Sequence, residues 1–359
     1  MSKYFSKRYE NLVPYTPGEQ PKEREYIKLN TNESPYPPSP RAIEKMKQKL
    51  DTLRLYSDPD CKELREALAS KYCVSADMIM VGNGSDDVLN MAFMSFCDDG
   101  RYASFADITY GCYETFSEIN ALPYKKIPVN ERLEIVADDY MGATGPVFIA
   151  NPNAYTGILL SNKDVEKILK ANPDNVVVID EAYGDFSDSS CIPLAIEYEN
   201  LIVVRTFSKS GSIAGSRLGF AIANAQLIRE MNMVRYSINP YNVNTISQAA
   251  GIGTLEDDQY IKRNCEIIMD TREKTAKRLR EMGFYLTDSK ANFLLAKSES
   301  IDGFSLYSRL KDRGILVRHN SNEKIKDYIR ITIGSPEEMD EFIESIREII
   351  REESKNEKS

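Results

Sequence analysis

The chain has 359 residues and a net charge of −9, and 28% of its residues are charged. This length is too great for one compact core and fits two domains, while the acidic balance argues against a surface for nucleic acid or anionic membranes. His319 is the single histidine, which leaves lysine, tyrosine and aspartate as the expected chemical groups, rather than a histidine triad or a histidine-rich metal site.

The six cysteines show no CxxC pair and no zinc-type spacing, so we interpret them as reduced thiols. No apolar run reaches the roughly twenty residues that cross a membrane. The N-terminal residues MSKYFSKRYE also lack the apolar core of a secretory signal. We therefore expect a cytoplasmic protein with neither a membrane segment nor a metal site.

Residues 1–40 are rich in proline and asparagine and are expected to form an ordered arm that packs with a small domain and the substrate site. From 41 to 255, apolar strand candidates alternate with helical segments. This alternation predicts an α/β fold with a large domain, in which helices cover a mostly parallel sheet. The strand candidates are residues 79–81, 147–150, 176–180, 201–204 and 218–223.

Residues 256–359 are predicted to form a smaller α+β domain. A long, charge-rich helical stretch at 256–282 connects it to the large domain, and strands are expected at FLLAK, ILVRH and YIRITIG. The last helix has a clear beginning, with Ser335 as the N-cap, Pro336 at the first position and Glu338 at the third.

Two segments that follow predicted strands suit an anionic ligand. In GNGSDD, Ser85 and Asp86 begin a helix, where free N–H groups and the positive end of the helix dipole bind phosphate. In TFSKSGSIAGSRLGF, small side chains surround Lys209, and Ser208 and Arg217 lie where both can reach one phosphate. Taken singly, an ordinary strand–turn–helix junction and a solvated surface lysine explain these segments at least as well.

Two further segments lie at the ends of predicted strands. In VVVIDEAYGDF, the strand ends in Asp180, and Tyr183 follows three residues later. Ligands of open α/β sheets sit at the carboxyl ends of strands, so an active-site carboxylate is expected at Asp180, with a helix or turn cap as the competing interpretation. The loop NPNAYTG also follows a strand, although such loops are usually only turns. Together, the four segments predict one shared site.

The order of these segments resembles that of the fold-type I pyridoxal-phosphate enzymes, and more closely that of the histidinol-phosphate aminotransferases. The similarity covers nearly the whole chain and includes LVPYTPG, KLNTNESPYPPSP, GNGSDD, TYGCYETF, NPNAYTG, VIDEAYGDF, TFSKSGSIAGSRLGF, PYNVNTISQAA and YIRITIG. The resemblance implies the fold-type I transferase fold and pyridoxal 5'-phosphate as cofactor. It also implies amino transfer between L-histidinol phosphate and 2-oxoglutarate in histidine biosynthesis.

The resemblance gives a role to each residue of these segments. It implies that Lys209 forms the Schiff base and then carries the proton as a free amine, that Asp180 pairs with the pyridinium nitrogen, and that Tyr183 hydrogen-bonds the phenolic oxygen of the ring. The other implied cofactor contacts are Tyr110 stacked on the ring, the phosphate-binding Ser85, Asp86, Thr206, Ser208 and Arg217, and Tyr56, which reaches the phosphate of the neighbouring subunit.

Substrate binding is implied for a second group of residues. Arg330 in YIRITIG matches the arginine that clamps an anionic substrate group, and the further candidates are Arg318, Tyr15 and Asn30. If Tyr56 acts across subunits, the active site is complete only in a homodimer, for which C2 symmetry is expected. The expected ligands are a phosphorylated amine or amino acid and 2-oxoglutarate or glutamate.

The loop NPNAYTG departs from the family pattern. The family has a second asparagine followed by a proline where this chain has Ala154 and Tyr155. The asparagine that usually hydrogen-bonds the phenolic oxygen is therefore missing by position, and Asn153 is the candidate to replace it.

Three other functions remain open from the sequence. An aminotransferase for aromatic or other amino acids and a threonine-phosphate decarboxylase use the same cofactor, and the sequence does not show which substrate bond stands perpendicular to the ring. The third is a non-catalytic relative or a nucleotide-binding α/β protein, but GSIAGSRLG does not fit the G-x-G-x-x-G pattern.

Overall fold

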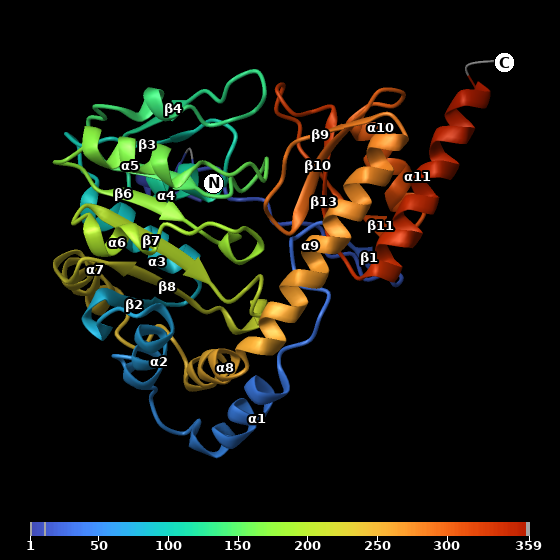
Figure 1. Cartoon of the computed structure of the whole chain (residues 1–359). Helices are drawn as coiled ribbons and strands as arrows, with labels where there is room; N and C mark the ends of the chain where they lie inside the picture. Colours follow the sequence, from blue (N-terminus) through green and yellow to red (C-terminus); the bar gives the residue numbers. More distant parts are fainter. Residues whose placement is uncertain (1, 11, 357–359) are drawn as a thin grey trace.

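A large seven-stranded sheet forms the centre of the computed structural model, which describes residues 2–10 and 12–356 (Figure 1). The strand order is β2-β8-β7-β6-β5-β3-β4. The strands are β2 (Ile79–Gly82), β3 (Ala103–Ala106), β4 (Tyr124–Ile127), β5 (Val147–Ala150), β6 (Val177–Asp180), β7 (Leu201–Thr206) and β8 (Gly219–Ala223). Only β8 pairs antiparallel with its neighbours, so the prediction of a mostly parallel sheet is confirmed.

Helices cover both faces of this sheet because its strands are apolar on both sides. In β6, Val178 packs into one hydrophobic layer, while Val177 and Ile179 pack into the other. The first layer includes α3 (Ser85–Phe96), α4 (Cys112–Ile119) and α7 (Ala225–Ile238), and the second includes α2 (Lys62–Tyr72), α5 (Asn162–Ala171), α6 (Leu194–Glu197) and α8 (Thr245–Glu256).

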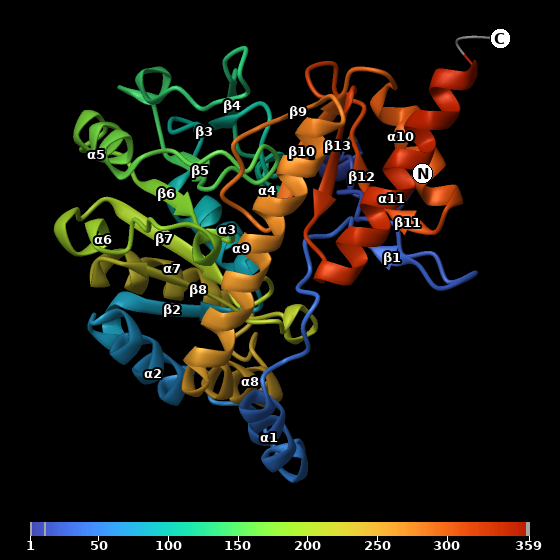
Figure 2. The same ribbon diagram turned by 45° about the vertical axis from the view of Figure 1, so that its right-hand side comes forward.

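A smaller antiparallel sheet has the strand order β12-β13-β10-β9. Its strands are β9 (Phe284–Leu286), β10 (Phe293–Ser298), β12 (Arg318–His319) and β13 (Tyr328–Thr332), and its helices are α9 (Asp258–Glu281), α10 (Gly303–Asp312) and α11 (Pro336–Asn356). Figure 2 shows α9 running between the two sheets. The large-plus-small architecture expected of the fold-type I class is therefore present.

The N-terminal segment joins the two parts of the molecule. Strand β1 (Ile27–Lys28) pairs in parallel with β11 (Ile315–Leu316). The chain then crosses to the large sheet, where α1 (Pro40–Gln48) packs against α8. Division of the chain at residues 40 and 255 into arm, large domain and small domain stays a prediction.

Most predicted elements are present. All five strand candidates of the large sheet form strands, and the capping pair of α11 is confirmed, since Ser335 N donates to Glu338 Oε2 at 2.7 Å and Glu338 N donates to Ser335 Oγ at 3.2 Å. ILVRH was expected as one strand but is divided at Val317 between β11 and β12, which belong to different sheets. Within the described residues, every helix is too short or too polar to span a bilayer.

Short 3-10 helices complete the chain: η1 (Lys7–Tyr9), η2 (Leu50–Thr52), η3 (Ala76–Met78), η4 (Ala137–Tyr140), η5 (Gly184–Phe186) and η6 (Ala214–Ser216).

Candidate active site

The candidate site lies at the carboxyl ends of neighbouring strands of the large sheet. Asp180 is the last residue of β6, and Thr206 is the last residue of β7, three positions before Lys209. Because β6 and β7 are parallel and adjacent, both strands deliver their final residues to the same edge of the sheet. The structure therefore brings Asp180 and the lysine segment together, as the sequence predicted.

Asp180 is a buried carboxylate with only neutral donors. Its side chain is 4% exposed, and its two oxygens accept from Tyr113 OH at 2.9 Å and Ala182 N at 3.1 Å. Burial raises the pKa of Asp180 to about 7, although both hydrogen bonds oppose the rise. Among the described residues it forms no ion pair, so its charge has no cationic partner within the protein.

Lys209 places its amine beside the N-terminal segment. Its Nζ donates to the carbonyl oxygen of Thr31 at 3.2 Å and lies 5.9 Å from the centre of the Tyr183 ring. Burial, and after it the Arg330 cation, lowers the pKa of Lys209 to about 8, against the attraction of Glu33 and Asp86. More of this amine is consequently unprotonated near neutral pH, and so available as a base or nucleophile, than that of a surface lysine.

The start of α3 lies next to Arg217, and both were predicted to bind phosphate. Gly84 precedes α3 with φ at +90°, a backbone conformation that favours glycine, and a Cβ there would lie 2.7 Å from Arg217 Nη2 and displace the guanidinium. Arg217 Nη2 pairs with Asp86 Oδ2 at 2.8 Å, and Tyr110 OH donates to Asp86 Oδ1 at 2.7 Å. The expected phosphate contact at Ser85 begins this helix.

Two hydroxyls of the lysine segment lie next to each other. Thr206 Oγ1 donates to Ser208 Oγ at 3.0 Å, and both side chains are 7% exposed. The single hydrogen of Thr206 Oγ1 is directed to Ser208 Oγ and to Leu218 O at 3.3 Å, and its oxygen accepts from Ser208 N at 3.1 Å. The Ser208 hydroxyl is therefore the one whose hydrogen is left for a phosphate.

Tyr183 and Asn153 were both predicted to contact the ring oxygen, but they differ in the hydrogen-bond donors that they have left. Tyr183 OH accepts from Asn32 Nδ2 at 2.9 Å. Asn153 instead uses its amide within the protein: Nδ2 donates to Ile108 O at 2.9 Å and to Thr156 Oγ1 at 3.2 Å, while Oδ1 accepts from Thr109 Oγ1 at 2.8 Å. With both amide hydrogens engaged, Asn153 has no spare donor for a ligand.

Arg330 has unused donor capacity. Its two terminal nitrogens make only long contacts of 3.4 Å to the carbonyl oxygens of Ala154 and Asn30, and its buried Nε has no hydrogen-bond partner among the described residues. The guanidinium stacks near Tyr155 and Phe293, with its Cζ 5.2 and 5.3 Å from their ring centres. A half-buried guanidinium with unused donors suits an anionic ligand group.

The other substrate candidates are tied to the N-terminal arm. Arg318 donates to the carbonyl oxygens of Thr16 at 2.9 Å and Pro17 at 3.1 Å, and Asn30 Nδ2 donates to Glu19 O at 2.9 Å. Tyr15 is 46% exposed and its ring centre lies 6.4 Å from that of Tyr110. These side chains thus place the arm beside the site.

Tyr56 lies apart from this cluster. Its side chain is 83% exposed and stacks on Tyr241 at 4.6 Å between ring centres. Within the described residues, it makes no hydrogen bond to Lys209, Asp180 or Arg217, and its predicted contact with a neighbouring subunit stays a prediction.

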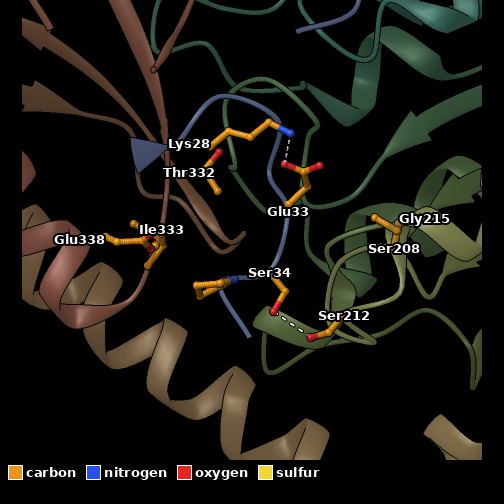
Figure 3. A pocket seen from close by; sticks show the side chains of 12 residues that line it. Lys28, Glu33, Ser34, Ser208, Ser212, Gly215, Thr332, Ile333 and Glu338 are labelled. Carbon is orange, nitrogen blue, oxygen red and sulfur yellow. Dashed lines mark hydrogen bonds and ion pairs between the residues drawn. The ribbon is translucent and has the colours of Figure 1, made fainter. Parts of the chain in front are cut away.

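A cavity of about 430 Å³ adjoins the site between the two sheets (Figure 3). Three segments line it: the N-terminal segment through Glu33, the lysine segment through Ser208, and the junction of β13 and α11 through Thr332. Across it, Ser212 Oγ donates to Ser34 Oγ at 2.8 Å. The cavity meets the candidate site through Ser208, but Lys209 does not line it.

Sequence reasoning missed two residues that contact the site. Tyr113 donates to Asp180, and Asn32 donates to Tyr183. Both lie in segments that were singled out, TYGCYETF and KLNTNESPYPPSP. The available signal was only their presence in those segments, because their contacts depend on the packing of distant strands.

The chain matches the family model described as aminotransferase class I and II over residues 24–346. It is 46% identical over 353 residues to a histidinol-phosphate aminotransferase of Brachyspira hyodysenteriae, covering 98% of this chain and 100% of that protein. It is 44% identical over 344 residues to a histidinol-phosphate aminotransferase of a Marinomonas species, covering 94% and 97%.

Solved structures share the fold at lower identity. The histidinol-phosphate aminotransferase of Sinorhizobium meliloti in complex with pyridoxal-5'-phosphate aligns with a TM-score of 0.89 at 22% identity, covering 98% of this chain and 99% of that one. An L-threonine-O-3-phosphate decarboxylase of Porphyromonas gingivalis aligns with a TM-score of 0.78 at 22% identity, covering 90% and 99%. The fold is therefore the one that the sequence predicted, and it is shared by enzymes with different reactions.

Proposed function

This chain belongs to the aminotransferase class I and II family, and we propose that it uses pyridoxal phosphate to move an amino group between L-histidinol phosphate and 2-oxoglutarate. The observation that carries the chemistry is a pair of residues at the ends of neighbouring strands: Lys209, with its pKa lowered to about 8, and the buried carboxylate Asp180. The names of relatives at 40–46% identity over nearly the whole chain support the substrate.

The residues of the site fit pyridoxal phosphate. Asp180 is buried without a cation, and a protonated ring nitrogen would supply one and bring the pKa of the carboxyl group back down. Arg217, the Thr206–Ser208 hydroxyl pair and the start of α3 would hold the phosphate. The Tyr110 ring, whose hydroxyl is fixed on Asp86, would lie against the ring of the cofactor.

When bound, the cofactor supplies a carbonyl group that captures amines and a ring that withdraws electrons from the reacting carbon. The protein supplies position and proton transfer. Lys209, partly unprotonated near neutral pH, would carry a proton as a free amine between the substrate carbon and the cofactor carbon. Its hydrogen bond to Thr31 O holds the amine at the edge of the N-terminal segment.

Arg330 would bind the anionic group of each substrate. Its Nε has no partner among the described residues and its two other contacts are long, so an anion can replace them without breaking strong bonds. The same residue then serves the phosphorylated amine and the dicarboxylate in turn. Arg318 and Asn30 hold the arm that borders this group.

We also propose a homodimer with shared active sites. Tyr56 and Tyr241 form an exposed aromatic pair, with 83% and 42% of their side chains accessible. Exposed aromatic rings of this kind are common at contacts between subunits. Tyr56 would reach the phosphate bound by the second subunit.

The test measures glutamate formed from 2-oxoglutarate with histidinol phosphate or phenylalanine as the amino donor. We expect kcat/KM to be at least about tenfold higher for histidinol phosphate, because Arg330 needs an anion that phenylalanine presents differently. A preference for phenylalanine would make the protein an aromatic aminotransferase. Release of carbon dioxide from threonine phosphate, without glutamate formation, would make it a decarboxylase.

A further inference from the structure

We propose that Asn32 is a positioning residue that keeps the Tyr183 hydroxyl available as a donor to the phenolic oxygen of the cofactor. This inference rests on the proposed function, since it requires bound pyridoxal phosphate. Asn32 lies between β1 and α1, is 1% exposed and has φ at 55°, a conformation that asparagine tolerates better than most residues.

Every polar atom of Asn32 has a partner. Its Nδ2 donates to Tyr183 OH at 2.9 Å, and its Oδ1 accepts from Thr332 Oγ1 at 3.0 Å. The backbone N of Asn32 donates to the same Thr332 oxygen at 2.9 Å, and its carbonyl accepts from Asn292 Nδ2 at 3.1 Å. Because Thr332 Oγ1 already accepts the backbone hydrogen, its own hydrogen goes to Oδ1, which turns Nδ2 toward Tyr183.

The direction of this bond decides what Tyr183 can do. A tyrosine hydroxyl carries one hydrogen, and Asn32 leaves it unused by donating to the oxygen. Among the described residues, Asn32 is the only hydrogen-bond partner of Tyr183 OH. Burial raises the pKa of Tyr183, whereas Arg330 and the donation from Asn32 lower it. The hydroxyl hydrogen is therefore left for a ligand.

Two features of this chain make that hydrogen important. Ala154 has no side-chain donor, and both amide hydrogens of Asn153 are bound within the protein. Tyr183 then serves the phenolic oxygen without an asparagine amide from this loop. Moreover, Thr332 belongs to β13, and Figure 3 shows it across the cavity from Ser208. Asn32 thus connects the small sheet to a cofactor contact of the large sheet.

The experiment is a spectrophotometric pH titration of the protein-bound cofactor without any substrate. Loss of a donor leaves more negative charge on the phenolic oxygen, which holds a neighbouring proton more tightly, so the midpoint should rise. Asn32→Gly, which suits the positive φ, should raise it by about one pH unit, the size of one hydrogen bond to a charged group. Asn32→Asp should raise it at least as much, because a carboxylate accepts the Tyr183 hydrogen.

The same substitutions in a Tyr183→Phe background test whether Asn32 acts through Tyr183. We expect Asn32→Gly to add no further shift there. Ser34→Ala is the matched control in the same segment, since Ser34 contacts Ser212 rather than Tyr183, and its midpoint should equal that of the wild type. Thr332→Val, which frees the amide of Asn32 to turn, should raise the midpoint, and Thr332→Ser should not.

Two results would overturn the inference alone: an unchanged midpoint in Asn32→Gly and Asn32→Asp with cofactor bound, or an equal shift in the Tyr183→Phe background. Wild-type protein that binds no pyridoxal phosphate would overturn the proposed function together with this inference. If the wild type binds cofactor but prefers another amino donor, the titration midpoints still test the role of Asn32.

Discussion

Asp180 gives the cofactor-free protein a pH-dependent stability. The pKa of its carboxyl group is raised from 3.8 to about 7 in the folded chain. A raised acid pKa contributes stability at low pH that is lost as pH rises through the folded value, so the free energy of unfolding should fall between those two pH values.

Asp180→Asn should remove this dependence. In chemical denaturation of the cofactor-free proteins, the free energy of unfolding of the variant should rise relative to that of the wild type between about pH 4 and about pH 7. The expected gain is on the order of a few kcal/mol. The cofactor-loaded wild type is the control, and its slope should be shallower because the ring nitrogen neutralises the carboxylate. If the free energies of unfolding of the two cofactor-free proteins change with pH in parallel, the raised pKa assigned to Asp180 is contradicted.

Arg330 and Arg318 make a second comparison at the residue scale. Arg330→Ala should raise KM for both histidinol phosphate and 2-oxoglutarate on the order of 10²-fold, because an anion loses its half-buried cationic partner. Arg318→Ala should raise KM less, since its guanidinium holds backbone oxygens of the arm rather than a free position. Steady-state kinetics with each substrate varied in turn measures both increases in KM. A larger increase in Arg318→Ala than in Arg330→Ala would assign the anion contact to Arg318.

At the scale of elements, a continuous apolar run decided what could be predicted. Strands such as β5 and β6, which contain three or more apolar residues in succession, were found from sequence alone, whereas β3 (ASFA) was missed although it is buried. Strand β4 was also missed, because it lies at the sheet edge with Lys125 and Lys126 exposed and has no apolar run. The division of ILVRH at Val317 also depends on which strand each half meets, and the local pattern carries no information on that.

The same limit applies to the site. Lys209 and Asp180 were predictable because each follows a buried strand in a distinctive segment. The bond from Asn32 to Tyr183 joins residues 151 positions apart. Its geometry follows from the way the N-terminal segment crosses between the sheets, so no local pattern indicated it.

The contact between α1 and α8 depends on a glycine. A Cβ at Gly253 would lie 2.5 Å from Ala42 Cα and 2.7 Å from the backbone oxygen of Arg41. Gly253→Ala should therefore push the helices apart and lower the free energy of unfolding by about 1–3 kcal/mol, although alanine favours helix more than glycine does. Gly100→Ala, where a Cβ meets one atom at 3.5 Å, is the control. If Gly253→Ala and Gly100→Ala have equal free energies of unfolding, α1 can move away from α8 without a loss of stability.

At the scale of the whole molecule, the shared site can be tested by mixing subunits. Tyr56→Phe should weaken cofactor binding, and Lys209→Ala should abolish turnover. A heterodimer of the two has one site with both substitutions and one with neither. At limiting cofactor, the mixture should therefore be more active than either parent. No recovery in dimers shown to have exchanged subunits would place Tyr56 in the site of its own chain.

The central claim is that Lys209 is the residue that bonds covalently to the cofactor. Borohydride reduction of the pyridoxal-phosphate-loaded protein, followed by peptide mass spectrometry, tests it most directly. The account predicts a single modified peptide that contains Lys209, and no modified peptide in Lys209→Ala treated in the same way. Modification of a different lysine in the wild type, or none at all in protein that retains the cofactor, would contradict it.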